Sequence, residues 1–175
     1  MCLPVELMIP DHMKISRIDW QTWLPEETAT LMFVVKSDQV LLIRKKRGLG
    51  AGKINGPGGR IEAGETPMQC AIRETEEELC ITPLNVKAAG ELFFHAEDMP
   101  RIHGHVFTAT GYKGTPTETD EAIPIWTSVN QLPFEEMWDD DQFWLPQVLA
   151  GVYIKGWFSF EGEILLDYQV KVVES

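Results

Sequence analysis

Residues 48–80 read GLGAGKINGPGGRIEAGETPMQCAIRETEEELC, a glycine-rich loop followed by a segment with helical periodicity. Thr66 is a favoured N-cap residue, Pro67 suits the first helical turn, and Gln69 completes a capping box with Thr66. These signals predict an α-helix over residues 67–79. Apolar spacing of four, three and four residues gives it a core-facing stripe, formed by Met68, Ile72, Thr75 and Leu79.

Three carboxylates project from another side of this predicted helix, those of Glu74, Glu77 and Glu78. They lie in its last turns, where the helix dipole disfavours an anion by about 0.3–1 kcal/mol, and at this spacing like charges repel. A purely structural role does not explain such an arrangement, whereas a divalent cation does. Carboxylate oxygens are hard ligands that suit Mg²⁺, with Mn²⁺ as the alternative.

The loop before the helix holds seven of the 14 glycines of the chain. Six of the 15 basic residues lie in or beside it, namely Arg44, Lys45, Lys46, Arg47, Lys53 and Arg60. Glycine lets backbone amides approach an anion closely, and the cations add attraction, so the loop is predicted to approach phosphate groups. It is not a Walker A loop, because Ile54 follows Lys53, and no G-x-G-x-x-G opens a helix here.

Loop and helix share one longer pattern: Gly59, five residues, Glu65, seven residues, Arg73-Glu74, two residues and Glu77-Glu78. This is the Nudix box, and the chain resembles a Nudix hydrolase over about residues 30–172. Residues 132–146, LPFEEMWDDDQFWLP, are similar to those of MutT-like members that hydrolyse oxidised purine nucleoside triphosphates. Thr75 stands where the family has a bulky aliphatic residue. Cys80 stands where it has glycine, at a helix end where a left-handed residue costs about 1–2 kcal/mol.

The resemblance implies roles for individual positions. Mg²⁺ would be bound by the carboxylates of Glu74, Glu77, Glu78 and Glu121 together with the carbonyl of Gly58. Arg73 would orient the glutamates. Trp138 would stack on the base, and hydrogen bonds to the base would come from Asn55, Asp140 and Asp141. The pocket would be lined by Thr30, Lys45, Leu49 and Phe94.

Hydrophobic patterning predicts an α+β fold, a mixed β-sheet between helices in an α/β/α sandwich. A hairpin is expected from residues 30–35 and 40–44. Further strands are expected at residues 86–94, 106–112, 157–160 and 164–173. A second helix is expected over residues 140–149, and Pro146 is expected either to bend this helix or to end its first half. The chain is interpreted as one domain, residues 1–175, in which residues 1–27 form an extension that covers a sheet edge, mediates dimerisation or simply packs.

Composition limits the partners of the chain. A length of 175 residues with 44% hydrophobic and 24% charged residues suits one folded domain. A net charge of -12 disfavours binding to DNA or RNA polymers. No apolar run is long enough to span a membrane. Cys2, Cys70 and Cys80 fit neither a disulfide framework nor a zinc pattern, which predicts reduced thiols and a cytoplasmic protein.

We therefore expect a monomeric or homodimeric enzyme that hydrolyses an oxidised purine nucleoside triphosphate such as 8-oxo-dGTP to the monophosphate and pyrophosphate. Two alternatives stay open, a Nudix pyrophosphohydrolase of broader or other nucleoside diphosphate-linked substrates and a module that senses a nucleotide without cleaving it. His103 and His105 alternate on an expected strand, but the sequence offers them no third metal ligand, so they are interpreted as structural or solvent-facing.

Overall fold

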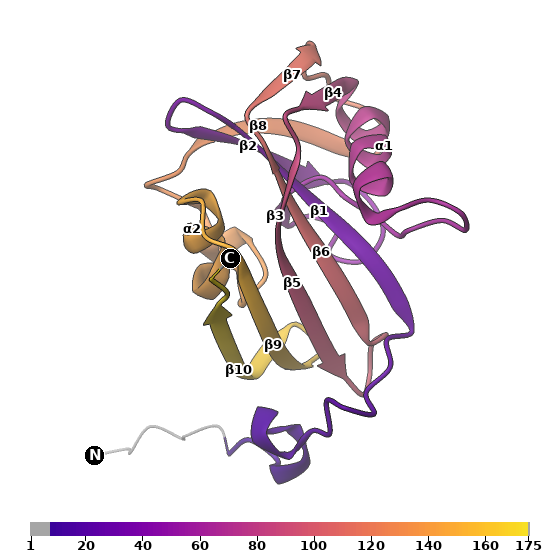
Figure 1. Ribbon diagram of the computed structural model, residues 1–175, viewed down its shortest axis with the longest axis vertical. Helices are drawn as coiled ribbons and strands as arrows, with labels where there is room; N and C mark the ends of the chain where they lie inside the picture. The colour runs from indigo at the N-terminus through magenta and orange to yellow at the C-terminus, as the bar shows by residue number, and fades with distance from the viewer. Residues whose placement is uncertain (1–7, 175) are drawn as a thin grey trace.

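The computed structural model describes residues 8–174, so Cys2 and the first seven residues of the N-terminal extension lie outside it. Ten strands and two α-helices make up most of the described chain (Figure 1). The strands are β1 (Glu27–Lys36), β2 (Gln39–Lys45), β3 (Ile54–Asn55), β4 (Ile81–Leu84), β5 (Lys87–Ala96), β6 (Ile102–Ala109), β7 (Gly111–Gly114), β8 (Ala122–Ser128), β9 (Ile154–Glu161) and β10 (Ile164–Val172). The α-helices are α1 (Pro67–Leu79) and α2 (Asp141–Leu149), and the 3₁₀ helices are η1 (Asp11–Met13), η2 (Ile15–Arg17) and η3 (Phe134–Glu136).

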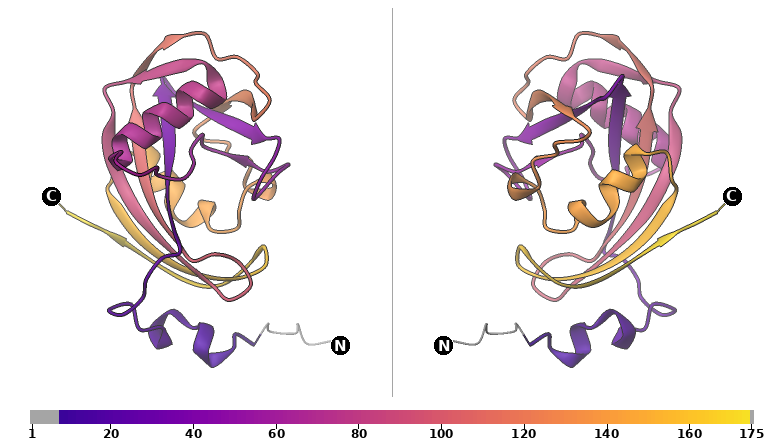
Figure 2. Two further views of the ribbon diagram at one scale, coloured as in Figure 1. Left: turned by 90° about the vertical axis from the view of Figure 1, so that its right-hand side faces the viewer. Right: turned by 90° about the vertical axis from the view of Figure 1, so that its left-hand side faces the viewer.

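The main sheet is mixed, which confirms the predicted fold class. Its order is β10-β9-β5-β6-β1-β2-β3, and β8 pairs with β2. β1 runs parallel to β6 and β5 parallel to β9, whereas the other pairs of this sheet are antiparallel. β4 and β7 form a separate two-stranded ribbon. The helices α1 and α2 lie on opposite faces of the main sheet (Figures 1 and 2).

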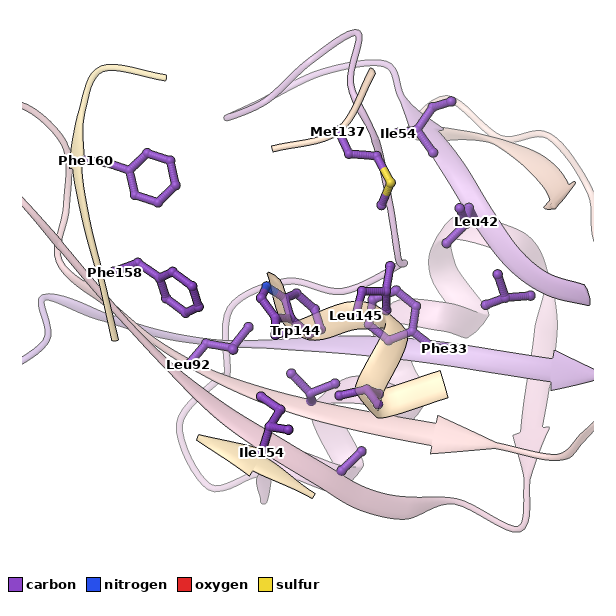
Figure 3. Packing of buried hydrophobic residues seen from close by; sticks show 14 of the residues in the cluster. Phe33, Leu42, Ile54, Leu92, Met137, Trp144, Leu145, Ile154, Phe158 and Phe160 are labelled. Atoms are coloured by element: carbon purple, nitrogen blue, oxygen red, sulfur yellow. The ribbon is translucent and has the colours of Figure 1, made fainter. Parts of the chain in front are cut away.

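Each face of the sheet has its own core because successive side chains of a strand point to opposite faces. Under α1, Met32 and Val34 of β1 pack with Leu79. On the other face, Phe33 packs edge-on against Trp144 of α2, with ring centroids 5.9 Å apart. Figure 3 shows this second cluster, whose labelled members are Phe33, Leu42, Ile54, Leu92, Met137, Trp144, Leu145, Ile154, Phe158 and Phe160.

Both predicted α-helices are confirmed, α1 with the expected bounds and α2 starting one residue later than expected. Of the two effects expected of Pro146, a bend or an end to the first half of the helix, the end does not occur, because α2 continues through this residue to Leu149. The predicted core stripe of α1 is also partly wrong, since Met68 is exposed. Cys70 is buried in its place, because residues 59–61 run beside α1 and cover its Cys70 side.

The expected strand over residues 106–112 is two strands, β6 and β7, which belong to different sheets. β4 and β8 were not predicted from the sequence, and each contains a proline, Pro83 or Pro124. Proline cannot donate to a ladder and therefore argues against an interior strand, yet it is tolerated where one edge is free. Both strands have a single partner, β7 for β4 and β2 for β8.

The described part of the N-terminal extension packs on the sheet. The backbone N–H of Ile15 donates to Asp167 of β10 at 2.8 Å. The indole N–H of Trp23 donates to Nδ1 of His95 at 3.2 Å, and its ring lies edge-on to Phe93. None of the helices in residues 8–174 is long and apolar enough to cross a membrane.

Candidate active site

The end of β3 continues into a tight segment, residues 56–59, which runs back along β1. Met32 donates its N–H to the carbonyl of Pro57 at 2.8 Å, and Thr30 donates to Gly59 at 2.9 Å. A Cβ at Gly58 would overlap the carbonyl oxygen of Thr30, and one at Gly59 would lie 2.5 Å from Cδ of Glu74. Glycine is therefore required at position 58 by close packing against the backbone of β1, whereas a side chain at position 59 would displace the Glu74 carboxylate.

Helix α1 begins and ends as its sequence predicts. The Thr66 hydroxyl accepts the N–H of Gln69, and the Gln69 side chain accepts the N–H of Thr66, so the capping box is complete. At the other end Cys80 has a left-handed backbone with φ of 61°, as expected for a position that the family fills with glycine. The two ends fix which side of α1 faces the segment 56–59.

Three carboxylates meet where α1, that segment and the start of β8 come together. Oxygen atoms of Glu74, Glu78 and Glu121 lie within 4.8 Å of one another. Glu78 is buried and accepts the N–H of Gly58 at 3.1 Å, so Gly58 also belongs to this place. The exposed Glu77, which was expected to complete the set, is not part of this group in the described chain; its carboxylate accepts a bond from Arg73 at 3.2 Å.

Burial and mutual repulsion act on these carboxylates when no metal neutralises them. Loss of water raises the pKa of Glu78 to about 8, and the charges of Glu74 and Glu121 add to this rise. Desolvation likewise raises the pKa of Glu74. The charge of a bound divalent cation would offset both shifts by stabilising the ionised carboxylates, and the three oxygen donors are of the type that Mg²⁺ prefers. The residues present therefore fit the metal that the sequence predicts.

Arg73 is held mainly by Glu65, for which the sequence predicted no role of its own. Its guanidinium makes two bonds to Glu65, of 2.9 and 2.6 Å, and a further bond to Glu74 at 2.9 Å. The hydrogen bonds from Arg73 lower the pKa of Glu65 to about 2. Glu65 thus fixes Arg73, and Arg73 fixes Glu74; the signal for this role was the place of Glu65 in the Nudix box.

The expected base-binding residues gather on the α2 face of the sheet. Asp140 and Asp141 are buried at the start of α2. Asp140 accepts the indole N–H of Trp144 at 2.8 Å, and burial raises its pKa to about 6. Burial and the neighbouring Asp140 raise the pKa of Asp141. Oδ2 of Asp141 is buried without a hydrogen-bond partner among residues 8–174. This oxygen can therefore accept a hydrogen bond from a ligand when the carboxyl is ionised, or donate one when it is protonated.

Aromatic rings surround the half-buried Trp138. Phe160 meets its ring edge-on at 6.0 Å, and Phe94 lies 6.2 Å from Phe160. Nζ of Lys53 lies over the ring of Trp138 at 5.1 Å. Phe160 and Lys53 were not predicted as neighbours of this site. Lys53 lies in the glycine-rich loop and Phe160 in an expected strand, but only the fold brings them to Trp138.

The remaining expected pocket residues divide between two places. Lys45 donates to the carbonyl of the exposed Leu49 at 2.7 Å, and Gly50 of the same loop lies against Trp138. Thr30 is different, since its hydroxyl lies beside Sγ of Cys70 and the carbonyl of Gly59. The structure therefore places Thr30 under the segment 56–59 on the α1 side of β1.

Asn55 ends β3, and its side chain accepts the N–H of Gly56. Gly58 follows three residues later at the carboxylates, so the backbone limits the distance between Asn55 and Gly58 to about 10 Å. The role of Asn55 in binding a base stays a prediction.

Comparison with known proteins agrees with this fold and shows the family. A NUDIX domain model matches residues 25–148, and the chain belongs to this family. Within it, the chain is 39% identical over 147 residues to an oxidized purine nucleoside triphosphate hydrolase of Danio rerio, covering 83% of this chain and 94% of the relative. The corresponding protein of Mus musculus is 37% identical over 148 residues, with 83% and 95% covered. A MutT protein of Bacillus halodurans has a similar fold, with a TM-score of 0.72, 27% identity, and 82% and 97% of the two chains covered.

Proposed function

We propose that this Nudix hydrolase cleaves oxidised purine nucleoside triphosphates of the 8-oxo-dGTP type to the monophosphate and pyrophosphate. The observation that carries the proposal is the buried pair Asp140 and Asp141 beside Trp138, with one oxygen of Asp141 unpartnered among the described residues. An unsatisfied buried carboxyl oxygen costs free energy, and this cost is recovered when a ligand group bonds to it. The relatives from Danio rerio and Mus musculus carry a name that agrees with this substrate class.

Phosphate chemistry is assigned to the carboxylate end of the site. Glu74, Glu78 and Glu121, with the carbonyl of Gly58, would hold Mg²⁺, which when bound lowers the pKa of water and neutralises phosphate charge. Arg73 positions Glu74 through their 2.9 Å bond and is itself held by Glu65. The donor atoms alone do not separate Mg²⁺ from Mn²⁺. Glu74 and Glu78 are both candidates for the general base.

Base recognition is assigned to the α2 end of the site. Trp138 would stack on any base and therefore give affinity without selectivity, about 1–3 kcal/mol. Selectivity would come from hydrogen bonds between a purine edge and the polar groups of Asn55, Asp140 and Asp141. A protonated carboxyl donates a hydrogen bond and an ionised one accepts, so a pair that shares one proton matches more than one oxidised purine.

The first test is kcat/KM for 8-oxo-dGTP against dGTP in the presence of Mg²⁺, followed by pyrophosphate release. A preference of about a hundredfold, equivalent to 2.7 kcal/mol, would support the assigned substrate class. Similar turnover of both nucleotides would favour the broader pyrophosphohydrolase. Binding without turnover would favour the sensing module.

Asp141→Asn provides the residue-level test, with Asp139→Asn as its matched control. Asp139 is adjacent in sequence but exposed, so both variants lose one carboxylate at the start of α2. Asp141→Asn is expected to reduce the preference for 8-oxo-dGTP at least tenfold, and Asp139→Asn to preserve it. A pH-independent ratio of rates on two different oxidised purines would count against proton sharing by Asp140 and Asp141.

A further inference from the structure

Another group of side chains of metal-ligand types, separate from the three carboxylates of the candidate active site, lies on the α1 side of the sheet. His103 and His105 point to this side of β6, because they lie four and two residues before Phe107 on the same face of the strand, and Phe107 packs in the core under α1. Glu91 of β5 is the cross-strand partner of His105. The two histidines have no third ligand near them in sequence, and the pairing of β5 with β6 supplies one.

The three side chains are close enough to share one ion. One ligand atom from each of Glu91, His103 and His105 lies within 4.8 Å of the other two. Nε2 of His103 is 3.1 Å from Oε1 of Glu91, and the two imidazole centroids are 4.4 Å apart. Ligands of a tetrahedral zinc ion, each about 2.0–2.2 Å from the metal, are separated by slightly more than 3 Å. Small side-chain rotations are sufficient to reach that geometry.

The surroundings hold this group in place. The ring of Phe93 stacks on His103 at 4.6 Å and on Trp157 at 5.7 Å, so the orientation of the imidazole is restricted. The side chains of His103 and Glu91 are only 22% and 23% exposed. Lys155 pairs with Oε2 of Glu91 at 3.3 Å and leaves Oε1 to face the histidines. Burial lowers the pKa of His105, which favours the neutral imidazole that a metal ion requires.

We propose that Glu91, His103 and His105 form a second metal site, which binds a transition-metal ion of the Zn²⁺ class through two imidazole nitrogens and one carboxylate oxygen. Imidazole favours Zn²⁺, Co²⁺, Ni²⁺ and Cu²⁺, whereas Mg²⁺ prefers oxygen ligands. The site is therefore chemically distinct from the carboxylates Glu74, Glu78 and Glu121. A bound ion would join β5 to β6 and leave a fourth position to water or another ligand.

Zn²⁺ titration of the full chain by calorimetry, in a large excess of Mg²⁺, tests the proposal. The excess Mg²⁺ occupies the carboxylate site, and the expected result is one equivalent of Zn²⁺ per chain. His103→Asn and His105→Asn are each expected to raise the Zn²⁺ dissociation constant at least tenfold, and the double variant at least a hundredfold. Co²⁺ in place of Zn²⁺ is expected to give visible absorption bands that the double variant lacks.

His12→Asn is the matched control, because His12 is an exposed histidine that pairs with Glu97 and is not one of the three grouped side chains. It is expected to bind Zn²⁺ as the unaltered protein does. Mg²⁺-dependent hydrolysis by the histidine variants checks their folding. If a variant does not fold, nuclear magnetic resonance of the four imidazole rings in the unaltered protein decides, since only His103 and His105 are expected to shift on Zn²⁺ addition. Absence of Zn²⁺ binding in excess Mg²⁺, equal binding by the double variant, or unshifted His103 and His105 rings would overturn the proposal.

Discussion

Replacement of Glu78 by glutamine is expected to stabilise the metal-free protein at alkaline pH. Burial raises the pKa of Glu78 from 4.5 to about 8, so the folded protein binds this proton more tightly than the unfolded chain does. The stability that depends on the bound proton is complete below the unfolded pKa of 4.5, and it is lost as pH rises towards the folded value. Glutamine fills similar space, accepts the N–H of Gly58 and never ionises.

The size of the effect follows from the two pKa values. One pKa unit corresponds to 1.36 kcal/mol, so the stability difference between Glu78→Gln and the unaltered protein should grow by at most about 5 kcal/mol between about pH 4.5 and pH 8. Urea denaturation at several pH values with a metal chelator measures this difference. Glu77→Gln is the matched control, since the exposed Glu77 also carries one carboxylate near the end of α1.

Added Mg²⁺ should make the unaltered protein more stable to unfolding than Glu78→Gln. An ion that binds only the folded state stabilises it, and Glu78→Gln loses one of the proposed ligands, so the unaltered protein should gain more from added Mg²⁺. Hydrolysis by Glu78→Gln should fall at least a hundredfold. A stability difference that stays constant across this pH range, or a variant that gains as much from Mg²⁺ as the unaltered protein, would refute the reasoning.

Three further changes have expected outcomes. Trp138→Ala should lower kcat/KM about 5- to 150-fold for both 8-oxo-dGTP and dGTP, because stacking is worth about 1–3 kcal/mol and does not select a base; a changed ratio of the two rates would contradict this role. Asp140→Asn should gain up to about 3 kcal/mol in urea stability relative to the unaltered protein as pH rises from about 4 to above 6, because burial raises the pKa of Asp140 from 3.8 to about 6; parallel pH profiles would contradict this. Cys80→Gly should raise the free energy of unfolding by about 1 kcal/mol, measured by denaturation, because φ of 61° suits glycine better; an unchanged or lower value would count against strain at this helix end.

Local signals determined helix α1 and its ends. The capping box, the N-terminal proline and the left-handed position at Cys80 depend on residues that are neighbours in the chain, so the sequence predicted them correctly. The same applies to the first hairpin, in which β1 and β2 meet across Ser37 and Asp38. The sequence pattern of glutamates, glycines and Arg73 was also sufficient to predict the family.

Tertiary structure decided which side chains meet. Glu121 joins Glu74 and Glu78 because β8 pairs with β2, and β8 is a proline-containing strand that local propensity does not predict. Glu77 belongs to the same helix but is exposed and lies outside this group, since exposure depends on what packs against each side of α1.

Tertiary structure also decides how the two histidines meet their proposed third ligand. His103 and His105 are close in sequence, whereas Glu91 reaches them only through the pairing of β5 with β6. Spacing along a chain fixes which residues share one element, because backbone periodicity is local. Long-range contacts depend on how strands pair and how helices pack, and these are properties of the whole core.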